Sequence, residues 1–572
     1  MRLRFLCFLV PLAAALLGFT AQADAKLPVL EPAEYPGMTT FNCRTDAITL
    51  QPGQNLNQLT LTKACPNAET VSGPLGPETF AAGSTAQGYM TRFKPSMVEV
   101  KPSGKLVTPA VWDLHLHHVV WLPPSGGRLA AGEEKTIAML PQGYGMKMSP
   151  TADWGLLHML HNLTAQPDRQ VYLTWQIDWV PETVPERTDI SQIRGVFFDV
   201  AAGGGAYPVF DAEREFDTDD NGRFVFPDDV STNPADASYE ELSKVSPQRS
   251  WTVPSSQQDG ITLLSAGGHL HPGGLHVDLK VARDGPDAGD VDGDDPAEVR
   301  PLFRSDAHYY EPAGAVSWDV AMTVARRDWR VHLEPGDTLS ISAAYDVKRA
   351  SWYESMGILS MGWTPNADPA ARDPFANDAE VRAMYEQGGA LTHRRLPENI
   401  DTHAREDLRL PDPRKLRAGG RLAGAGVPID SFFFENGGFS AIERFPADVM
   451  QPPVISPGGT VTFTNEDALP TQPQTDQEWH TITACRSPCT GGSGVGYPLA
   501  NGPVDFDSGQ LGFGTGLNSN VTIGSNTWTT PPLGNLPELR TVRGAKRGTT
   551  YSYFCRLHPF MRGSFRVRGS GR

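Results

Sequence analysis

The stretch Tyr551-Ser-Tyr-Phe-Cys-Arg-Leu-His-Pro-Phe-Met-Arg-Gly-Ser-Phe-Arg-Val567 predicts two β-strands joined by a short loop. The loop carries Cys555, His558 and Met561 at C-x2-H-x2-M spacing, so a thiolate, an imidazole and a thioether are available to one point. Thiolate and thioether ligands suit Cu(I), and imidazole suits copper in both oxidation states. The plainer alternative is that the Cys and the Met are core residues.

A second imidazole is available upstream at His480, in the strand-like run Glu478-Trp-His-Thr-Ile482. Two imidazoles, one thiolate and a weak axial Met are the ligand set of a blue-copper electron-transfer site. The sequence therefore predicts a type 1 copper site formed by His480, Cys555, His558 and Met561.

The cysteine count supports this interpretation. Six Cys become five once Cys7 is removed with the leader, and in an oxidising compartment these should pair where they can. The pairs that we expect are Cys43 with Cys65 and Cys485 with Cys489. Cys555 is then left over, which a copper ligand explains.

The motif Cys555-x-x-His-Pro-Phe-Met-Arg-Gly563 resembles the ligand loop of amicyanin, within the plastocyanin-like cupredoxins. The resemblance covers residues 427–567 and implies a Greek-key β-sandwich with the outer edge of His558 as electron port. A multicopper oxidase is disfavoured, because Phe554 and Arg556 flank Cys555 where those enzymes have a His.

The beginning of the chain has the features of a secretory signal peptide: a basic start, an apolar run and small residues before the cleavage point. We expect cleavage near residue 23 or 25 and a secreted or periplasmic protein. No later run of 18 apolar residues follows, so no membrane span is expected. The formal net charge of −17 argues against nucleic acid as a partner.

Histidines are concentrated in three strand-like runs. In Val111–Trp121, alternation puts His115 and His117 on one face and His118 on the other, unless the strand bulges there. Metal binding is favoured over a surface position, because the flanking residues are apolar.

In the second run, Trp154–Leu163, His158 and His161 share a face only if the segment is helical. The third run carries His269 and His271 as H-x-H, which points both side chains to one face of a strand. H-x-H also occurs by chance, so two residues alone are a weak indication of metal.

Taken together, these runs resemble the copper type II monooxygenases, the family of peptidylglycine α-hydroxylating and dopamine β-monooxygenases. The resemblance implies two stacked jelly-roll sandwiches with one copper each. The implied ligands are His117, His118 and His161 in the first, with His158 as substitute, and His269, His271 and Met356 in the second, with Met361 as substitute. The family's disulfide pattern is missing, so we expect a shared fold rather than preserved hydroxylase chemistry.

With 57 Gly, 49 Pro and 20% charged residues, the composition also predicts a mainly β protein. We expect two N-terminal antiparallel β-sandwiches, a linker rich in Asp, Arg, Pro and Gly, and a C-terminal cupredoxin sandwich. The expected boundaries are 1–23 for the signal peptide, 24–200 and 201–363 for the two sandwiches, 364–426 for the linker and 427–572 for the cupredoxin domain.

An acidic loop fits the D-x-D-x-N-G spacing of a calcium site. Its oxygen ligands would be Asp217, Asp219, Asn221 and Asp228. The flanks do not read as helices, so a solvated acidic turn is an equal alternative.

The favoured function is one-electron transfer by an exported blue-copper protein. The type 1 copper would exchange its electron with a partner or with further coppers in the sandwiches. The runner-up is a copper-dependent monooxygenase or oxidoreductase with a built-in cupredoxin electron donor, and the third hypothesis is a non-catalytic copper-handling protein. The expected partner is a redox protein or a small-molecule reductant. The sequence does not identify a substrate.

Overall fold

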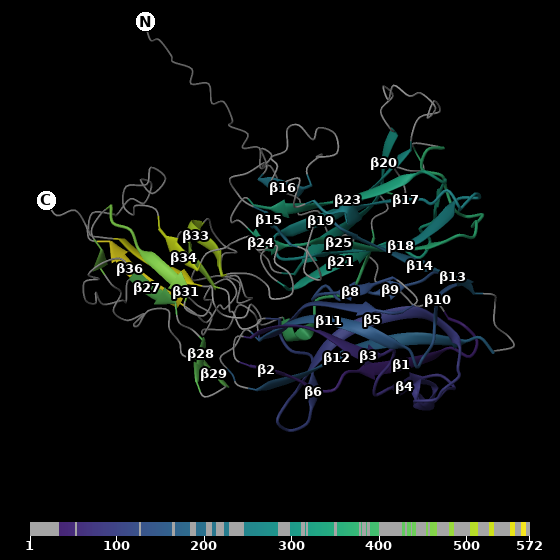
Figure 1. Cartoon of the computed structure of the whole chain (residues 1–572), viewed down its shortest axis with the longest axis horizontal. Helices are drawn as coiled ribbons and strands as arrows, with labels where there is room; N and C mark the ends of the chain where they lie inside the picture. Colours follow the sequence, from purple (N-terminus) through teal and green to yellow (C-terminus); the bar gives the residue numbers. More distant parts are fainter. Residues whose placement is uncertain are drawn as a thin grey trace, which may run out of the picture.

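The computed structural model is built from β-sheets whose strands are mostly antiparallel, which confirms the predicted mainly β fold class (Figure 1). The described residues are 34–51, 54–111, 113–124, 127–162, 166, 168–183, 190–201, 209–212, 222–227, 245–283, 298–310, 315, 318–347, 352–376, 379, 385, 389–399, 426–429, 432–435, 438–441, 454–455, 458–465, 480–485, 504–512, 526–530, 549–554 and 562–567.

Two sheets form the first sandwich. The nine-stranded sheet contains β1 (Thr39–Arg44), β2 (Ile48–Leu50), β4 (Glu69–Ser72), β5 (Gly88–Val100), β6 (Leu106–Val107), β9 (Ala138–Met139), β10 (Tyr144–Met148), β12 (Arg169–Pro181) and β13 (Ser191–Gln192). The four-stranded sheet has the order β3-β11-β7-β8, with β3 (Asn55–Lys63), β11 (Asp153–Asn162), β7 (Leu114–Leu122) and β8 (Leu129–Ala131).

Alternating apolar residues hold these two sheets face to face. In β12 every second residue from Val171 to Trp179 is fully buried, as the period of two in a strand requires. The ring of Trp121, from the four-stranded sheet, packs edge-on against Phe93 at 4.8 Å and Trp175 at 5.4 Å, both from the nine-stranded sheet. The core of the first sandwich therefore lies between the sheets, and the other face of β7 and β11 is directed away from it.

An eleven-stranded sheet forms the second sandwich. Its main path is β14 (Arg194–Asp199), β25 (Gly357–Thr364), β18 (Ile261–Leu270), β21 (Val320–Val324), β20 (Glu298–Tyr309), β19 (Gly274–Arg283), β23 (Thr338–Asp346) and β16 (Arg223–Phe226). Its side branches are β17 (Ser250–Thr252), β22 (Val331–Leu333) and β26 (Ala390–Leu391). The strands β15 (Phe210–Ala212) and β24 (Trp352–Ser355) pair separately. Phe198 of β14 and Phe226 of β16, from opposite ends of the path, belong to one apolar cluster, so the sheet curves around a single core.

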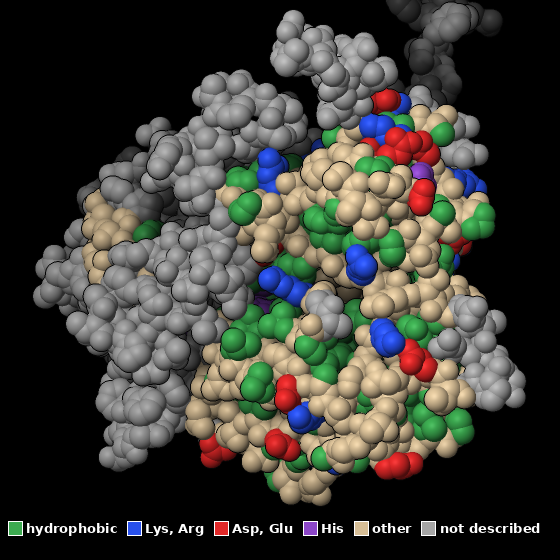
Figure 2. Space-filling model, turned by 45° about the vertical axis from the view of Figure 1, so that its right-hand side comes forward, with side chains coloured by type: hydrophobic (Ala, Val, Ile, Leu, Met, Phe, Trp, Pro, Cys, Tyr) green, Lys and Arg blue, Asp and Glu red, His purple; other side chains and the backbone are tan. Residues whose placement is uncertain are grey.

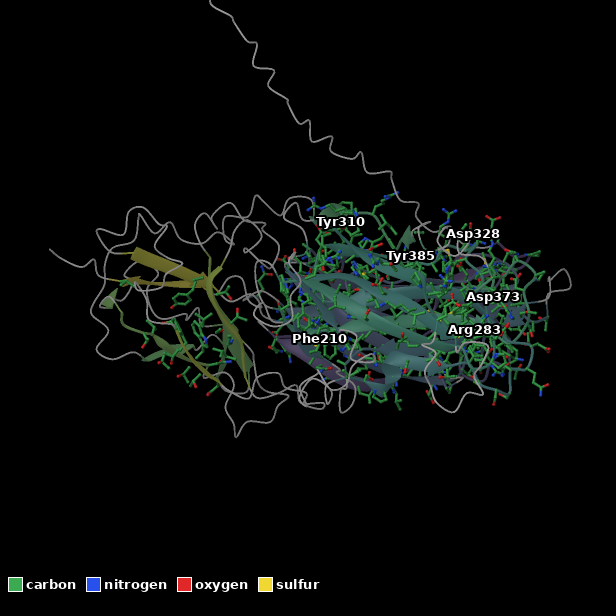
Figure 3. The ribbon with its side chains drawn as sticks, turned by 90° about the horizontal axis from the view of Figure 1, so that it is seen from above. Phe210, Arg283, Tyr310, Asp328, Asp373 and Tyr385 are labelled. Atoms are coloured by element: carbon green, nitrogen blue, oxygen red, sulfur yellow. A yellow bond between two sulfur atoms is a disulfide. The ribbon has the colours of Figure 1, made fainter. Side chains whose placement is uncertain are left out.

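The segment after β25 packs against the second sandwich. Arg283 of β19 contacts Asp337 at 2.7 Å and Asp373 at 3.1 Å, and its guanidinium lies 4.3 Å from the ring centre of Phe375 (Figure 3). Further along, the buried strand β26 pairs with β21. The range expected as a linker, 364–426, thus contributes a strand to the second sandwich.

Three smaller sheets follow near the C-terminus. They are β27-β31-β34 (Gly426–Ile429, Thr462–Asn465, Thr527–Thr529), β28-β29 (Phe432–Glu435, Gly438–Ala441) and β30-β36-β35-β32-β33 (Val454–Ile455, Arg562–Val567, Thr549–Phe554, His480–Cys485, Val504–Leu511). Short 3₁₀ turns elsewhere span Pro77–Phe80, Pro247–Arg249 and Pro397–Asn399. Within the described ranges, no helix has the length and apolar character needed to cross a membrane.

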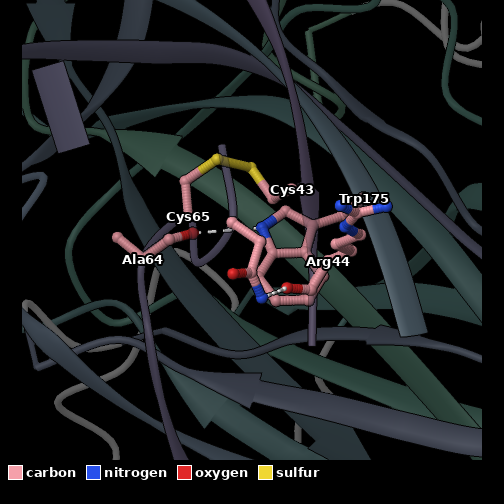
Figure 4. The surroundings of a disulfide bond; sticks show 6 residues. Cys43, Arg44, Ala64, Cys65 and Trp175 are labelled. Carbon is pink, nitrogen blue, oxygen red and sulfur yellow. Dashed lines mark hydrogen bonds between the residues drawn. A yellow bond between two sulfur atoms is a disulfide. The ribbon is translucent and has the colours of Figure 1, made fainter. Parts of the chain in front are cut away.

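The disulfide Cys43–Cys65 links β1 to the turn after β3, which confirms one predicted pair (Figure 4). Beside it, the indole of Trp175 donates a hydrogen bond to the Ala64 carbonyl at 3.0 Å. Both cysteines are buried in the first core.

Candidate metal centre

A β-bulge in β7 brings three histidines to one face. The ladder with β11 shifts by one residue at His117. Leu116 and Val119, on the two sides of the shift, both point into the first core. His115, His117 and His118 therefore share the outer face, where strict alternation would have separated His118 from the other two.

Strand β11 adds one histidine to that face. His161 lies directly opposite His115 in the ladder, and their ring centres are 5.1 Å apart. Because β11 is a strand, His158 points to the other face, and burial lowers its pKa to about 4. Of the two histidines in this run, the structure brings His161 and not His158 to the cluster. The neighbouring Met159 places its sulfur 2.8 Å from Nδ1 of His117.

The second sandwich supplies His269, His271 and Met356. The two imidazole ring centres are 5.2 Å apart, and Met356 directly precedes β25, the neighbour of β18. The Tyr345 hydroxyl accepts hydrogen bonds from the backbone N–H groups of His271 and Met356 and donates one to the Met356 carbonyl. One buried hydroxyl thus fixes both segments. Met361 lies in the core of the second sandwich, away from these histidines.

Four of these histidines, here called the interface histidines, meet where the sandwiches touch: His115, His117 and His161 from the first and His271 from the second. The ring centre of His271 is 4.5 Å from that of His117, closer than the 5.2 Å to its own H-x-H partner. Trp318 of the second sandwich stacks on His115 at 4.7 Å and contacts His117 and His271 with ring centres 4.7 and 5.1 Å away.

These side chains are hidden from solvent. The interface histidines are 2–5% exposed, and histidine shows only as small isolated spots on the face in Figure 2. Burial lowers the pKa of His117 well below its ordinary value, and the neighbouring histidines lower it further. The ring is therefore neutral at physiological pH, which is the form that binds metals.

A second group of side chains, contributed by both sandwiches, surrounds a cavity of about 480 Å³ between them. His118 lines it from the first sandwich, and His269 and Met356 line it from the second. Its remaining wall is mostly apolar, with Arg128 and Asp199 as charged members. Burial, together with the nearby His269 and His158, lowers the pKa of His118 to about 3, so this ring is also neutral.

Glu134 of the first sandwich reaches across to His269. Its Oε1 lies 3.0 Å from Nδ1 of His269, and the two side chains are 1% and 5% exposed. Burial alone would raise the pKa of Glu134, but His269 and the hydrogen bond from the Gly132 N–H leave it below its ordinary value. A Cβ at Gly132 would lie 2.8 Å from Cε1 of His269, so glycine is what lets the imidazole approach this closely.

The donor set suits a soft or borderline metal, since it combines imidazoles with the thioethers of Met159 and Met356. Nε2 of His269 and Oε2 of Glu134 are buried without a hydrogen-bond partner among the described residues. These two atoms are therefore available to bind a metal ion or another ligand. In the same part of the chain, no three His, Cys, Asp or Glu side chains are already arranged to hold a metal ion. Binding would therefore require the rings to turn.

Of the predicted type 1 copper ligands, His480 is described. It is fully buried at the first position of β32 and pairs with Leu511 of β33. Asn465 donates a hydrogen bond to the Leu511 carbonyl at 2.8 Å, which ties β31 to this pair. On its other side β32 pairs with β35, where Thr483 lies opposite Phe554, the residue before Cys555 in the sequence.

Other predicted features lie outside the described residues. They are the signal peptide, the ligands Cys555, His558 and Met561, the calcium loop with Asp217, Asp219, Asn221 and Asp228, and the Cys485–Cys489 pair, of which only the Cys485 backbone is described.

Several residues at the centre carry no signal in the sequence. Glu134 follows a short strand without any motif, and Trp318 and Tyr345 read as ordinary core aromatics. Met159 lies between the two histidines of its run, which is the one hint that was available.

Comparisons with known proteins add no functional information. No protein-family model and no curated protein matches the chain. Among solved structures, broad bean stain virus is similar over 61% of this chain and 93% of that one, with 9% identity and a TM-score of 0.20. The infectious bursal disease virus VP2 subviral particle is similar over 60% and 76%, with 11% identity and a TM-score of 0.17.

Proposed function

We propose that this chain is an exported blue-copper protein that carries out one-electron transfer through a type 1 site. The observation that carries the proposal is the pairing of β32, which begins with the buried His480, with β35, which ends one residue before Cys555. The pairing thereby brings the strand that begins with His480 next to the strand that precedes Cys555, which supports their acting as ligands of one copper.

The residues present fit that metal. Cys555 and Met561 supply the soft sulfur ligands, and His480 and His558 supply the imidazoles. Bound copper would supply a one-electron couple whose potential depends on the axial Met and on burial around the Cys sulfur. The packing of Phe463 on the fully buried Tyr553, with ring centres 5.1 Å apart, stabilises the sheet that carries the site.

The visible spectrum of the copper-loaded full-length chain tests this proposal. We expect an intense thiolate-to-Cu(II) band that disappears in Cys555→Ser and persists in His269→Ala, which alters the other candidate site. A colourless copper-loaded chain, or Cys555 found in a disulfide, would overturn the proposal.

A second candidate function, a copper-dependent oxidoreductase, is favoured by the buried histidines and the cavity between the sandwiches. His118, His269 and Met356 line a space whose volume is typical of small-molecule sites. In this hypothesis the sandwiches bind copper and a substrate, and the cupredoxin domain passes on electrons from a redox protein or a small-molecule reductant.

Copper content and oxygen uptake distinguish the two functions. The oxidoreductase hypothesis predicts three coppers per chain and ascorbate-driven O₂ consumption that His269→Ala abolishes. One copper per chain would exclude metal in the sandwiches and leave electron transfer intact. Three coppers without O₂ consumption would instead indicate a copper-handling protein.

A further inference from the structure

The interface histidines bring together residues that the sequence assigns to different sites. His271 was expected to chelate metal with His269, yet its ring is closer to His117 of the other sandwich. The rings of His269 and His271 are nearly perpendicular, at 87°. His269 is held instead by Glu134 and lines the cavity with His118. The H-x-H pair is thus divided between two neighbourhoods.

The spacing of the interface histidines suits one metal ion. A metal-bound imidazole nitrogen lies about 2.0–2.1 Å from the ion, so two rings on a tetrahedral ion have centres roughly 5 Å apart. Three of the separations lie near that value: 4.5 Å for His117 and His271, 5.1 Å for His115 and His161, and 5.6 Å for His115 and His117. The rings are thus close enough to share one ion once they turn towards it.

Trp318 packs against three of the four rings. Its indole is nearly parallel to His115, at 21°, and is inclined at 82° to His117 and at 59° to His271. The residue is 5% exposed and belongs to the core of the second sandwich. It therefore contacts rings from both sandwiches and shields them from water.

We propose that His115, His117, His161 and His271 surround a single metal ion that is shared between the two sandwiches. Imidazoles suit zinc, copper, iron and nickel, and the second candidate function makes this ion copper. The inference rests on the second candidate function only in assuming that the sandwiches bind copper. It differs from the ligand sets expected from the monooxygenase resemblance, because His115 becomes a ligand and His271 leaves the H-x-H pair. Metal at this position links the sandwiches directly, so its binding also stabilises their contact.

The test is copper stoichiometry in the full-length chain carrying Cys555→Ser, which removes the type 1 site. This chain should hold two coppers, and His115→Ala and His271→Ala should each lose one. The double variant should lose no more than either single variant, because both residues serve the same ion. His158→Ala is the matched control: it is an equally buried histidine on the other face of β11 and should retain both coppers.

A second readout is thermal stability. Copper should raise the unfolding temperature of the Cys555→Ser chain and of His158→Ala by the same amount, and should raise it less in His115→Ala and His271→Ala. Retention of both coppers in His115→Ala, or loss of two in the double variant, would overturn the shared centre. If the Cys555→Ser chain binds no copper, the shared centre and the oxidoreductase hypothesis both fail, while the blue band of the unmodified chain still tests electron transfer.

Discussion

The pair formed by Glu134 and His269 gives a sharp prediction, because it joins the two sandwiches through one hydrogen bond to a candidate metal ligand. With the side chains 1% and 5% exposed, water does not screen the interaction. Glu134→Gln keeps the shape of the side chain and removes the charge that orients the imidazole with Nε2 available to metal.

The expected loss follows from that geometry. A hydrogen bond to a charged group contributes about 1.5–3 kcal/mol. Losing the partner that orients a ligating histidine usually lowers metal affinity by about 10–100-fold. We therefore expect about 2 kcal/mol, or roughly 30-fold weaker binding of the copper held by His269.

The assay is competition for Cu(I) with a chromogenic chelator, in the full-length chain carrying Cys555→Ser. Glu99→Gln is the matched control, since Glu99 is equally buried and is bonded to Arg169 at 2.6 Å within the first sandwich. Glu99→Gln should lower stability without changing copper affinity. If Glu134→Gln binds both coppers as tightly as this control, the reasoning about His269 is wrong.

Three further predictions concern other parts of the fold. Tyr345→Phe removes the hydroxyl that is hydrogen-bonded to the backbone of Met356, and it should lower the free energy of unfolding by about 1–3 kcal/mol in urea titrations. An unchanged midpoint would contradict the role of that hydroxyl. Burial lowers the pKa of His276 from 6.5 to about 4, so this imidazole binds a proton less well in the folded state than in the unfolded state. The contribution of neutral His276 to the free energy of unfolding is therefore complete above pH 6.5 and is lost as the pH falls towards 4. His276→Gln should flatten the stability curve over this range by up to about 3 kcal/mol, and a curve of unchanged slope would refute this assignment. Replacing Cys43 and Cys65 with Ser removes a disulfide that closes a loop of 22 residues, and it should lower the free energy of unfolding by about 3 kcal/mol relative to the oxidised parent chain. Denaturant unfolding of the reduced parent chain should show the same loss.

The sequence predicted the strands well because burial on one face leaves a period of two. The runs carrying His115 and His161 are adjacent strands, β7 and β11. The H-x-H pair was expected on a strand, and His269 lies at the end of β18 while His271 directly follows it. These are local properties, which alternation and β-branched or aromatic residues encode directly.

What the sequence did not predict depends on register and on docking. A bulge near His118 was left open by the sequence, and the pairing with β11 decides it: the ladder shifts at His117 and turns His118 to the outer face. Glu134 and His269 are 135 residues apart, and their contact exists only because the two sandwiches pack together. The type 1 copper ligands Cys555, His558 and Met561 stay a prediction, since they lie outside the described residues.

The composition of the contact between the sandwiches bears on how the protein works. Two sandwiches that needed only to adhere could use apolar side chains, since buried imidazoles and carboxylates lower stability unless they are satisfied. Here Leu264 of the second sandwich packs into the first core, but part of the contact is made by His117 against His271 and by Glu134 against His269. One nitrogen of His269 has no hydrogen-bond partner in the described part of the chain. A ligand that bound Nε2 of His269 would strengthen the contact and fix the shape of the cavity beside it. Metal content, the stability of the contact and access to the cavity should therefore change together. A variant that lost copper at the interface histidines but kept its unfolding temperature would show that the contact does not depend on metal.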